Sequence, residues 1–234
     1  MFAITFLDIP SKKNAGWSYN TWRTRLVLNY KKVDYKTEWV EYPDIASRLQ
    51  DHVVPNHPGT TAYTLPALQG DRFHIMGSAA IASFLEGKFP EPSLHLSPHI
   101  QEVETAVARI MQPTRGAWLL LVSNNLLNPK SKEYFDSTRG DSLGKTLEAL
   151  HAEDGGEEAW IESLPKFKAL GELLGKEGGP FVMGSTISYA DFIILGWLQF
   201  FKTIDEALLK KVVDIEPALG KIYDAGNPWL ERVD

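Results

Sequence analysis

The chain has 234 residues, of which 44% are apolar and 23% are charged. This length favours two domains, and the composition is that of a globular protein rather than a disordered or fibrous one. The net charge of −6 includes no basic stripe, which argues against nucleic acid or an anionic membrane as partners. Without cysteine, the chain cannot form disulfides, thiolate metal sites or a cysteine nucleophile.

The start of the chain, MFAITFLDIP, is apolar but short and lacks a basic segment, so we expect a strand rather than a signal peptide. That strand would cover Phe2–Asp8. The sequence then predicts a helix over Thr21–Lys32, because its apolar residues recur on one face, and an alternating second strand over Tyr35–Glu41. Pro43 suits the first turn of a second helix that ends near Gln50.

A proline- and glycine-rich loop precedes a predicted hairpin, whose strands Leu65–Gln69 and Arg72–Met76 flank Gly70-Asp71. Ser78 is expected to cap a third helix. The order β-α-β-α-β-β-α thus occupies residues 1–88, and the proline-rich segment 89–98 is the best candidate for a linker.

The remaining residues, 99–234, are expected to be all-helical. Apolar residues keep a helical period on both sides of Pro113, which predicts a kink there. Two further helices are predicted over Tyr134–His151 and Trp160–Gly175.

The strongest helix signal begins at Ser188. Asp191 stands three residues on and can reach back to the Ser188 N–H, as in a capping box, while Ile187 and Phe192 can form a hydrophobic staple. The following run FIILGWL is apolar on all sides, which indicates a central buried helix.

Three features of the first 88 residues could form a binding site, although each has a plain structural alternative. Ser18 stands between the first strand and the first helix, where it is either a simple cap or a hydroxyl that holds an anion at a helix N-terminus. Pro66 is either an ordinary first residue of a strand or a cis-proline that turns the preceding backbone toward a ligand. Ser78 is either a helix cap or a carboxylate-binding residue.

Taken together, these features resemble the cytosolic glutathione transferases over nearly the whole chain. The matching segments are WSYNTWRTRLVLNY (17–30), TLPAL (64–68), GSAAI (77–81) and STISYADFIILGWL (185–198). The Ser-x-x-x-Trp-Arg-x-Arg spacing that begins at Ser18 is similar to the serine classes. TEWVEYPDI (37–45) and STRGDSLGKTLEAL (137–150) are similar to the fungal etherase-related class.

This resemblance implies an α/β thioredoxin-like N-terminal domain, an all-α C-terminal domain and glutathione as co-substrate. It makes Ser18 the catalytic hydroxyl that binds the glutathione sulfur. The expected glutathione-binding residues are Asn20, His52, Leu65, Pro66, Gly77 and Ser78. Gly77 departs from the acidic residue usual in the family, and His52 has the alternative of being an ordinary surface histidine.

The acceptor substrate is expected to contact five residues on the family pattern. These are Trp17, Tyr19, Met111, Arg115 and Trp118, although helical aromatic residues also serve as plain core. No histidine has metal-ligand spacing, so no metal is expected.

The sequence therefore predicts a cytoplasmic, homodimeric glutathione transferase. It would activate the thiol for attack on hydrophobic or aromatic electrophiles, with aryl ether cleavage as a further possibility. Two alternatives are a non-catalytic carrier of aromatic molecules and a domain kept for protein–protein contacts.

Overall fold

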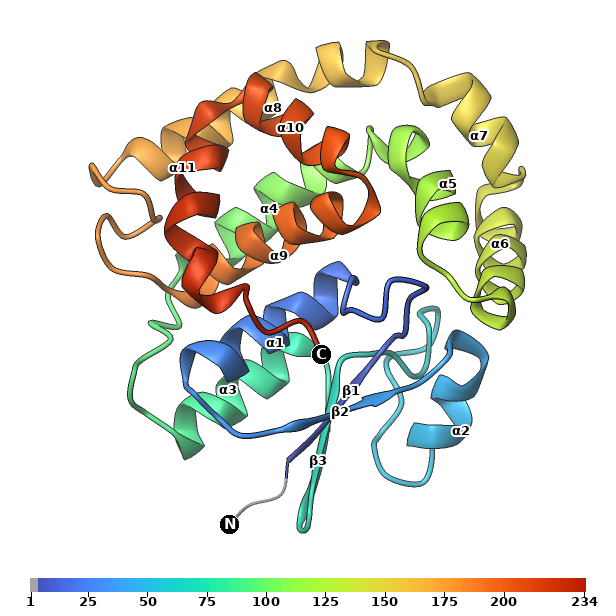
Figure 1. Cartoon of the computed structure of the whole chain (residues 1–234), viewed down its shortest axis with the longest axis vertical. Coiled ribbons are helices and arrows are strands. Elements are labelled where there is room, and N and C mark those ends of the chain that lie inside the picture. The colour runs from blue at the N-terminus through green and yellow to red at the C-terminus, as the bar shows by residue number, and fades with distance from the viewer. Residues whose placement is uncertain (1–3) are drawn as a thin grey trace.

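The structure is a computed structural model that describes residues 4–234. Its N-terminal part has the predicted order of strands and helices (Figure 1). The elements are β1 (Thr5–Asp8), α1 (Tyr19–Tyr30), β2 (Lys36–Trp39), η1 (Tyr42–Asp44), α2 (Ile45–Leu49), β3 (Ala67–Gly70), β4 (Phe73–Met76) and α3 (Ser78–Lys88). The first two residues of the predicted strand, Phe2 and Ala3, lie outside the described part.

Four strands form one mixed sheet in the order β2-β1-β3-β4. The strand β1 pairs with β2 in parallel and with β3 antiparallel, so that Phe6 stands opposite Thr37 on one side and Leu68 on the other. The helices α1 and α3 lie on one side of this sheet and α2 on the other (Figure 1). This is the predicted thioredoxin-like arrangement, in which the end of β1 lies beside the start of β3 and the end of β4 leads directly into α3.

The C-terminal part is helical, as predicted. It contains α4 (His99–Met111), α5 (Arg115–Asn125), α6 (Pro129–Leu143), α7 (Leu147–Asp154), α8 (Glu158–Gly175), α9 (Tyr189–Ile204), α10 (Glu206–Ile215), α11 (Pro217–Gly226) and η2 (Asn227–Trp229). Within residues 4–234, no helix is long and apolar enough to cross a membrane.

Two helix predictions need correction. Pro113 does not kink one helix but lies in the break between α4 and α5. The predicted helix over Tyr134–His151 is two helices, because Gly144 adopts a left-handed φ of 67° that ends α6. Thr146 then caps α7 by accepting a hydrogen bond from the Ala149 N–H at 3.2 Å.

The helix α9 forms the centre of the molecule, and its capping box is present as predicted. The Asp191 side chain is fully buried. One of its oxygens accepts from the Ser188 N–H at 2.8 Å and the Ser188 hydroxyl at 2.7 Å, and the other accepts from the Val182 N–H at 2.7 Å. Every polar contact of this carboxyl is therefore local and buried, which fixes the start of α9 firmly.

Close packing joins α9 to α1. A side chain at Gly196 would place its Cβ 3.3 Å from the Tyr19 carbonyl oxygen and 3.4 Å from the Arg23 nitrogen. Glycine at this position therefore lets the two backbones approach each other. The helix that begins beside Ser18 rests directly on the buried helix of the C-terminal part.

The segment 89–98 contains neither helix nor strand, and a buried lysine holds its first half. The Lys31 ammonium donates to the Glu86 carboxylate at 2.7 Å and to the Phe89 and Pro92 carbonyl oxygens at 2.6 and 2.8 Å. The Glu91–Pro92 peptide is cis, which the sequence analysis did not anticipate. The end of α1 and the end of α3 are thus tied to the same stretch of chain.

Candidate active site

Ser18 lies at the N-cap of α1, after the loop of residues 9–17 that follows β1. Its backbone is extended, with φ −67° and ψ 134°, and its carbonyl oxygen accepts the first helical hydrogen bond from the Trp22 N–H at 2.9 Å. The Ser18 side chain makes no capping hydrogen bond and is only partly buried. The hydroxyl is consequently available at a helix N-terminus, where unpaired N–H groups and the helix dipole favour an anion.

The peptide between Leu65 and Pro66 is cis, which is the second of the two alternatives that the sequence left open for Pro66. Leu65 is buried, yet neither its N–H nor its C=O has a hydrogen-bond partner among residues 4–234. Buried backbone groups are almost always paired, so Leu65, just before β3, presents a free donor and a free acceptor to a ligand with peptide-like groups. Pro66 in turn accepts a hydrogen bond from the Gly77 N–H at 2.9 Å, which fixes the start of α3 beside it.

Gly77, rather than Ser78, is the N-cap of α3, so the predicted cap is displaced by one residue. The reason is conformational, because the cap has φ 94°, which glycine adopts freely and serine rarely adopts. Ser78 becomes the first helical residue. Gly77 therefore sets the direction of α3, a role that the sequence analysis did not give it.

Ser78 lies beside Tyr189, the first residue of α9. Burial raises the pKa of the Tyr189 phenol, while the neighbouring Arg23 guanidinium and Ser78 hydroxyl oppose that rise. Arg23 also forms an ion pair with Glu104 of α4 at 2.9 Å and lies 4.1 Å from the centre of the Tyr19 ring. Arg23 thus links the start of α3 to the cavity described next.

A cavity of about 320 Å³ lies between the first turns of α1 and the helices α4 and α5. It is lined by Tyr19, Arg23, Glu104, Ala108, Met111, Gln112, Arg115 and Trp118. Four of the five predicted acceptor residues are therefore brought together around one space. Trp17 is not among the lining residues, because it is buried in the core against Tyr42 and Phe200.

Tyr19 links the serine to this cavity, since it follows Ser18 and lines the wall. Burial raises the pKa of its phenol to about 12, against the opposing effect of the Arg23 guanidinium. The Tyr19 hydroxyl therefore remains protonated at neutral pH and can act only as a neutral donor or acceptor. Asn20, the next residue, is exposed.

His52 is exposed and stacks on His74 of β4, with ring centres 4.4 Å apart. Burial lowers the pKa of His74, and the nearby His52 and Arg48 add to that effect. Within the described part of the chain, no group of three or more histidine, cysteine or acidic side chains is placed to hold a metal.

The sequence analysis missed several residues of the cavity wall, namely Arg23, Glu104, Ala108 and Gln112. A signal for part of this set was present. Glu104, Ala108 and Met111 follow one another at intervals of four and three residues, which places them on one face of α4. Reading that face as a unit would have extended the wall from Met111 back to Glu104.

Models of glutathione S-transferase domains match both parts of the chain. The N-terminal domain matches residues 17–88 and the C-terminal domain matches residues 102–219. A glutathione S-transferase-like protein of Aspergillus flavus, ustS, is 33% identical over 97% of this chain and 90% of its own length. The chain therefore belongs to the glutathione S-transferase family.

Solved structures of fungal glutathione transferases have the same fold over nearly their full length. A glutathione S-transferase of Ceriporiopsis subvermispora, solved in complex with glutathione, is 30% identical, with a TM-score of 0.87 over 99% of both chains. A glutathione transferase of Phanerochaete chrysosporium, GSTFuA3, is 29% identical, with a TM-score of 0.83 over 99% of this chain and 98% of its own.

Proposed function

We propose that this chain binds glutathione and uses the Ser18 hydroxyl to activate its thiol. The free hydroxyl of Ser18 at the start of α1 carries the proposal. Bound glutathione would supply a sulfur nucleophile for a hydrophobic or aromatic electrophile. The likeness to a fungal family member solved with glutathione supports this choice of co-substrate.

The residues fit the tripeptide at separate points. The unpaired N–H and C=O of Leu65 suit its cysteinyl backbone, and Ser78 with the first turn of α3 suits its γ-glutamyl carboxylate. His52 suits the glycyl carboxylate from the exposed end of α2. Gly77 offers no side chain to the γ-glutamyl amine, so we expect weaker binding than in relatives with an acid there.

Ser18 would act by donating a hydrogen bond to the sulfur. A free thiol has a pKa of about 8.5, so only a few per cent is thiolate at neutral pH. Lowering that pKa by ~2 units requires about 2.7 kcal/mol. One hydrogen bond to a charged group contributes about 1.5–3 kcal/mol, and the helix dipole adds about 0.3–1 kcal/mol.

The cavity beside Tyr19 is the proposed acceptor site. Its wall combines the rings of Tyr19 and Trp118 with the flexible side chain of Met111, which suits a planar apolar molecule. Aryl ether cleavage rests on the resemblance of segments 37–45 and 137–150 to the etherase-related class. We further propose a cytoplasmic homodimer, with an N-terminal domain over 1–88, a linker over 89–98 and a C-terminal domain over 99–234.

The test is Ser18→Ala, followed by ultraviolet titration of bound glutathione and by turnover of an aromatic electrophile. We expect a raised thiol pKa and a tenfold to hundredfold loss of turnover, on the scale of about 1.5–3 kcal/mol. Glutathione affinity should change less, because Leu65 and Ser78 bind other parts of the tripeptide. An unchanged thiol pKa would remove Ser18 from this role and make Asn20 the next residue to replace.

The same measurements distinguish a catalytic transferase from a non-catalytic carrier of aromatic molecules. The aromatic wall of the cavity would also suit a carrier of phenolic molecules. Binding of such molecules without glutathione, together with no turnover of any electrophile, would favour the carrier. Failure to bind either class would favour a role in protein–protein contacts.

A further inference from the structure

The last residues of the chain run back to the loop that contains Ser18. We call Leu230–Asp234 the tail. The N–H of Gly16, two residues before Ser18, donates to the Val233 carbonyl oxygen at 2.7 Å. The Gly16 carbonyl oxygen in turn accepts from the Trp22 indole N–H at 3.0 Å. The two backbone polar groups of this buried glycine are thus held from opposite sides, one by the tail and one by α1.

Arg25 connects the same loop to the tail a second time. Its guanidinium donates to the Asp8 carboxylate at 2.8 Å, and both side chains are completely buried. It also donates to the Asp234 carbonyl oxygen. A Cβ at Gly16 would lie only 2.9 Å from the Arg25 Nε, so the loop backbone rests directly on the guanidinium. Arg25 is therefore in contact with the end of β1, with Gly16 in the loop before Ser18, and with the tail.

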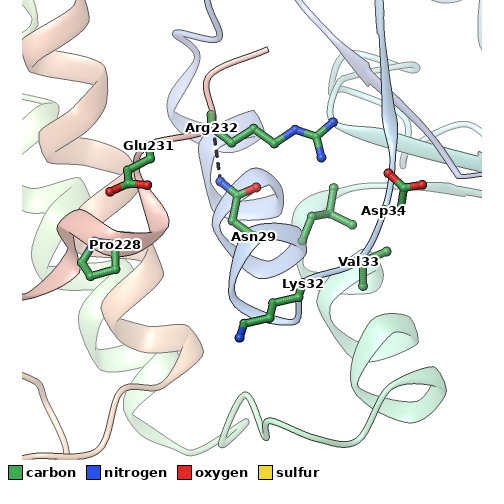
Figure 2. A pocket seen from close by; sticks show the side chains of 8 residues that line it. Asn29, Lys32, Val33, Asp34, Pro228, Glu231 and Arg232 are labelled. Carbon is green, nitrogen blue, oxygen red and sulfur yellow. Dashed lines mark hydrogen bonds between the residues drawn. The ribbon is translucent and has the colours of Figure 1, made fainter.

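Further contacts fasten the tail along α1. Asn29, one turn after Arg25, donates to the carbonyl oxygens of Trp229 at 2.8 Å and Arg232 at 3.3 Å. Figure 2 shows the Asn29 amide directed at the Arg232 backbone. The Arg232 guanidinium donates to the Tyr35 carbonyl oxygen at 2.6 Å and lies 3.6 Å from the centre of the Tyr35 ring. In Figure 1 the chain end accordingly lies beside α1, near the strands.

We propose that the tail is a positioning element for the active site, which holds the loop Gly16–Ser18 so that the serine hydroxyl faces bound glutathione. The inference rests on the proposed role of Ser18. The physical reason is local, because only Trp17 separates the buried, doubly held backbone of Gly16 from Ser18 and its reacting hydroxyl. Releasing the Gly16 N–H leaves a buried donor unpaired, and the loop must move to satisfy it.

The first experiment shortens the chain after Glu231, which removes the carbonyl acceptors of Val233 and Asp234 together with Arg232 and its contacts to Asn29 and Tyr35. We expect amide exchange in residues 14–20 to rise about tenfold, and the bound thiol to lose part of its lowered pKa. Turnover should fall about tenfold with little change in glutathione affinity. Glu231→Gln is the matched control, because it alters an exposed residue of the same segment and leaves the backbone contacts in place. Unchanged exchange and an unchanged thiol pKa in the folded, shortened protein would overturn the proposal.

The second experiment keeps the chain at full length. Gly16→Ala forces the loop away from Arg25 and decides the question if the shortened chain does not fold. A raised thiol pKa at a near-normal denaturation midpoint supports the proposal, and an unchanged thiol pKa overturns it. Ser18→Ala separates the two ideas. If Ser18→Ala leaves the thiol pKa unchanged, the proposed role of Ser18 fails, while amide exchange in the shortened chain still decides whether the tail holds the loop.

Discussion

The helices α1 and α9 both have a serine at the N-cap, and the two serines differ in their hydrogen bonds. At the start of α9, the Ser188 N–H and hydroxyl both donate to Asp191, and the whole group is buried. At the start of α1, the Ser18 hydroxyl makes no capping bond and is partly exposed. The same residue at the same helix position thus stabilises the fold in one case and keeps an unpaired hydroxyl in the other.

The difference lies in the third residue of each helix. Asp191 supplies a carboxylate that can reach back to Ser188, whereas Thr21 stands at the equivalent position after Ser18. The Thr21 hydroxyl donates to the Ser18 carbonyl oxygen at 3.0 Å and leaves the serine hydroxyl alone. An N-cap serine without an acid three residues later is therefore the one to consider for ligand binding.

The largest expected effect is on the α9 side of this comparison. Asp191→Ala leaves two buried N–H groups and one hydroxyl without their acceptor, so we expect a loss of about 3 kcal/mol of unfolding free energy. Urea denaturation measures it. The thiol pKa of glutathione bound to the remaining folded protein should not change. A midpoint equal to that of the parent would show that this capping box contributes nothing.

A pH titration sharpens the same prediction. Burial raises the pKa of Asp191 above its ordinary value of 3.8. The folded state therefore binds a proton more tightly than the unfolded state, and stability should fall as pH rises from about 3.8 through the raised value. Asp191→Asn, which does not titrate, should lack this component. If the unfolding free energy of the two proteins depends on pH in the same way, Asp191 is not the titrating group.

An intermediate effect is expected for Ser18→Asp. A carboxylate at this N-cap can accept from the free N–H groups of α1, so stability should rise by about 1 kcal/mol. The same negative charge should repel the thiolate and raise the pKa of bound glutathione. The urea midpoint should therefore rise, while ultraviolet titration should show less thiolate at neutral pH. If the Ser18→Asp protein gains stability and keeps its turnover, the Ser18 hydroxyl does not activate the thiol, and the proposed difference between the two serines is wrong.

The smallest effect concerns stability alone. Ser18→Ala should change the unfolding free energy by less than about 0.5 kcal/mol, since no hydrogen bond of the side chain is lost. Ser188→Ala should remove about 1 kcal/mol, because its hydroxyl is bonded and buried. Urea midpoints of the two proteins, measured side by side, test the contrast. Equal losses would mean that Ser18 also caps its helix in solution.

Much of the fold was predictable because its signals are local. The apolar face of Trp22 and Leu26 predicted α1, and the three-residue spacing of Ser188 and Asp191 predicted the start of α9. The sequence analysis missed the break at Gly144, although its signal is equally local. A glycine followed by a serine- or threonine-type cap marks the end of one helix and the start of another.

The site was only partly predictable because it depends on contacts between distant residues. Ser18, Tyr19 and Met111 could be placed by motif, but Arg23 and Glu104 pair across 81 residues and Gly16 meets Val233 across more than 200. No spacing rule predicts such pairs, since they arise only when two separately folded segments pack together. The role of Gly77 was missed for a related reason, because its N–H donates to the Pro66 carbonyl oxygen on the far side of the β3–β4 hairpin.

The buried ammonium of Lys31 has a consequence for recombination between relatives. Because Lys31 donates to the Phe89 and Pro92 carbonyl oxygens and to Glu86, the first half of the segment after α3 completes the N-terminal part rather than merely spacing it from the next. A fragment cut after residue 88 would lose two of the three acceptors of a desolvated cation. Chimeras that exchange halves between family members should therefore place the junction beyond residue 94, so that the lysine and the carbonyl groups that accept its hydrogen bonds come from the same parent.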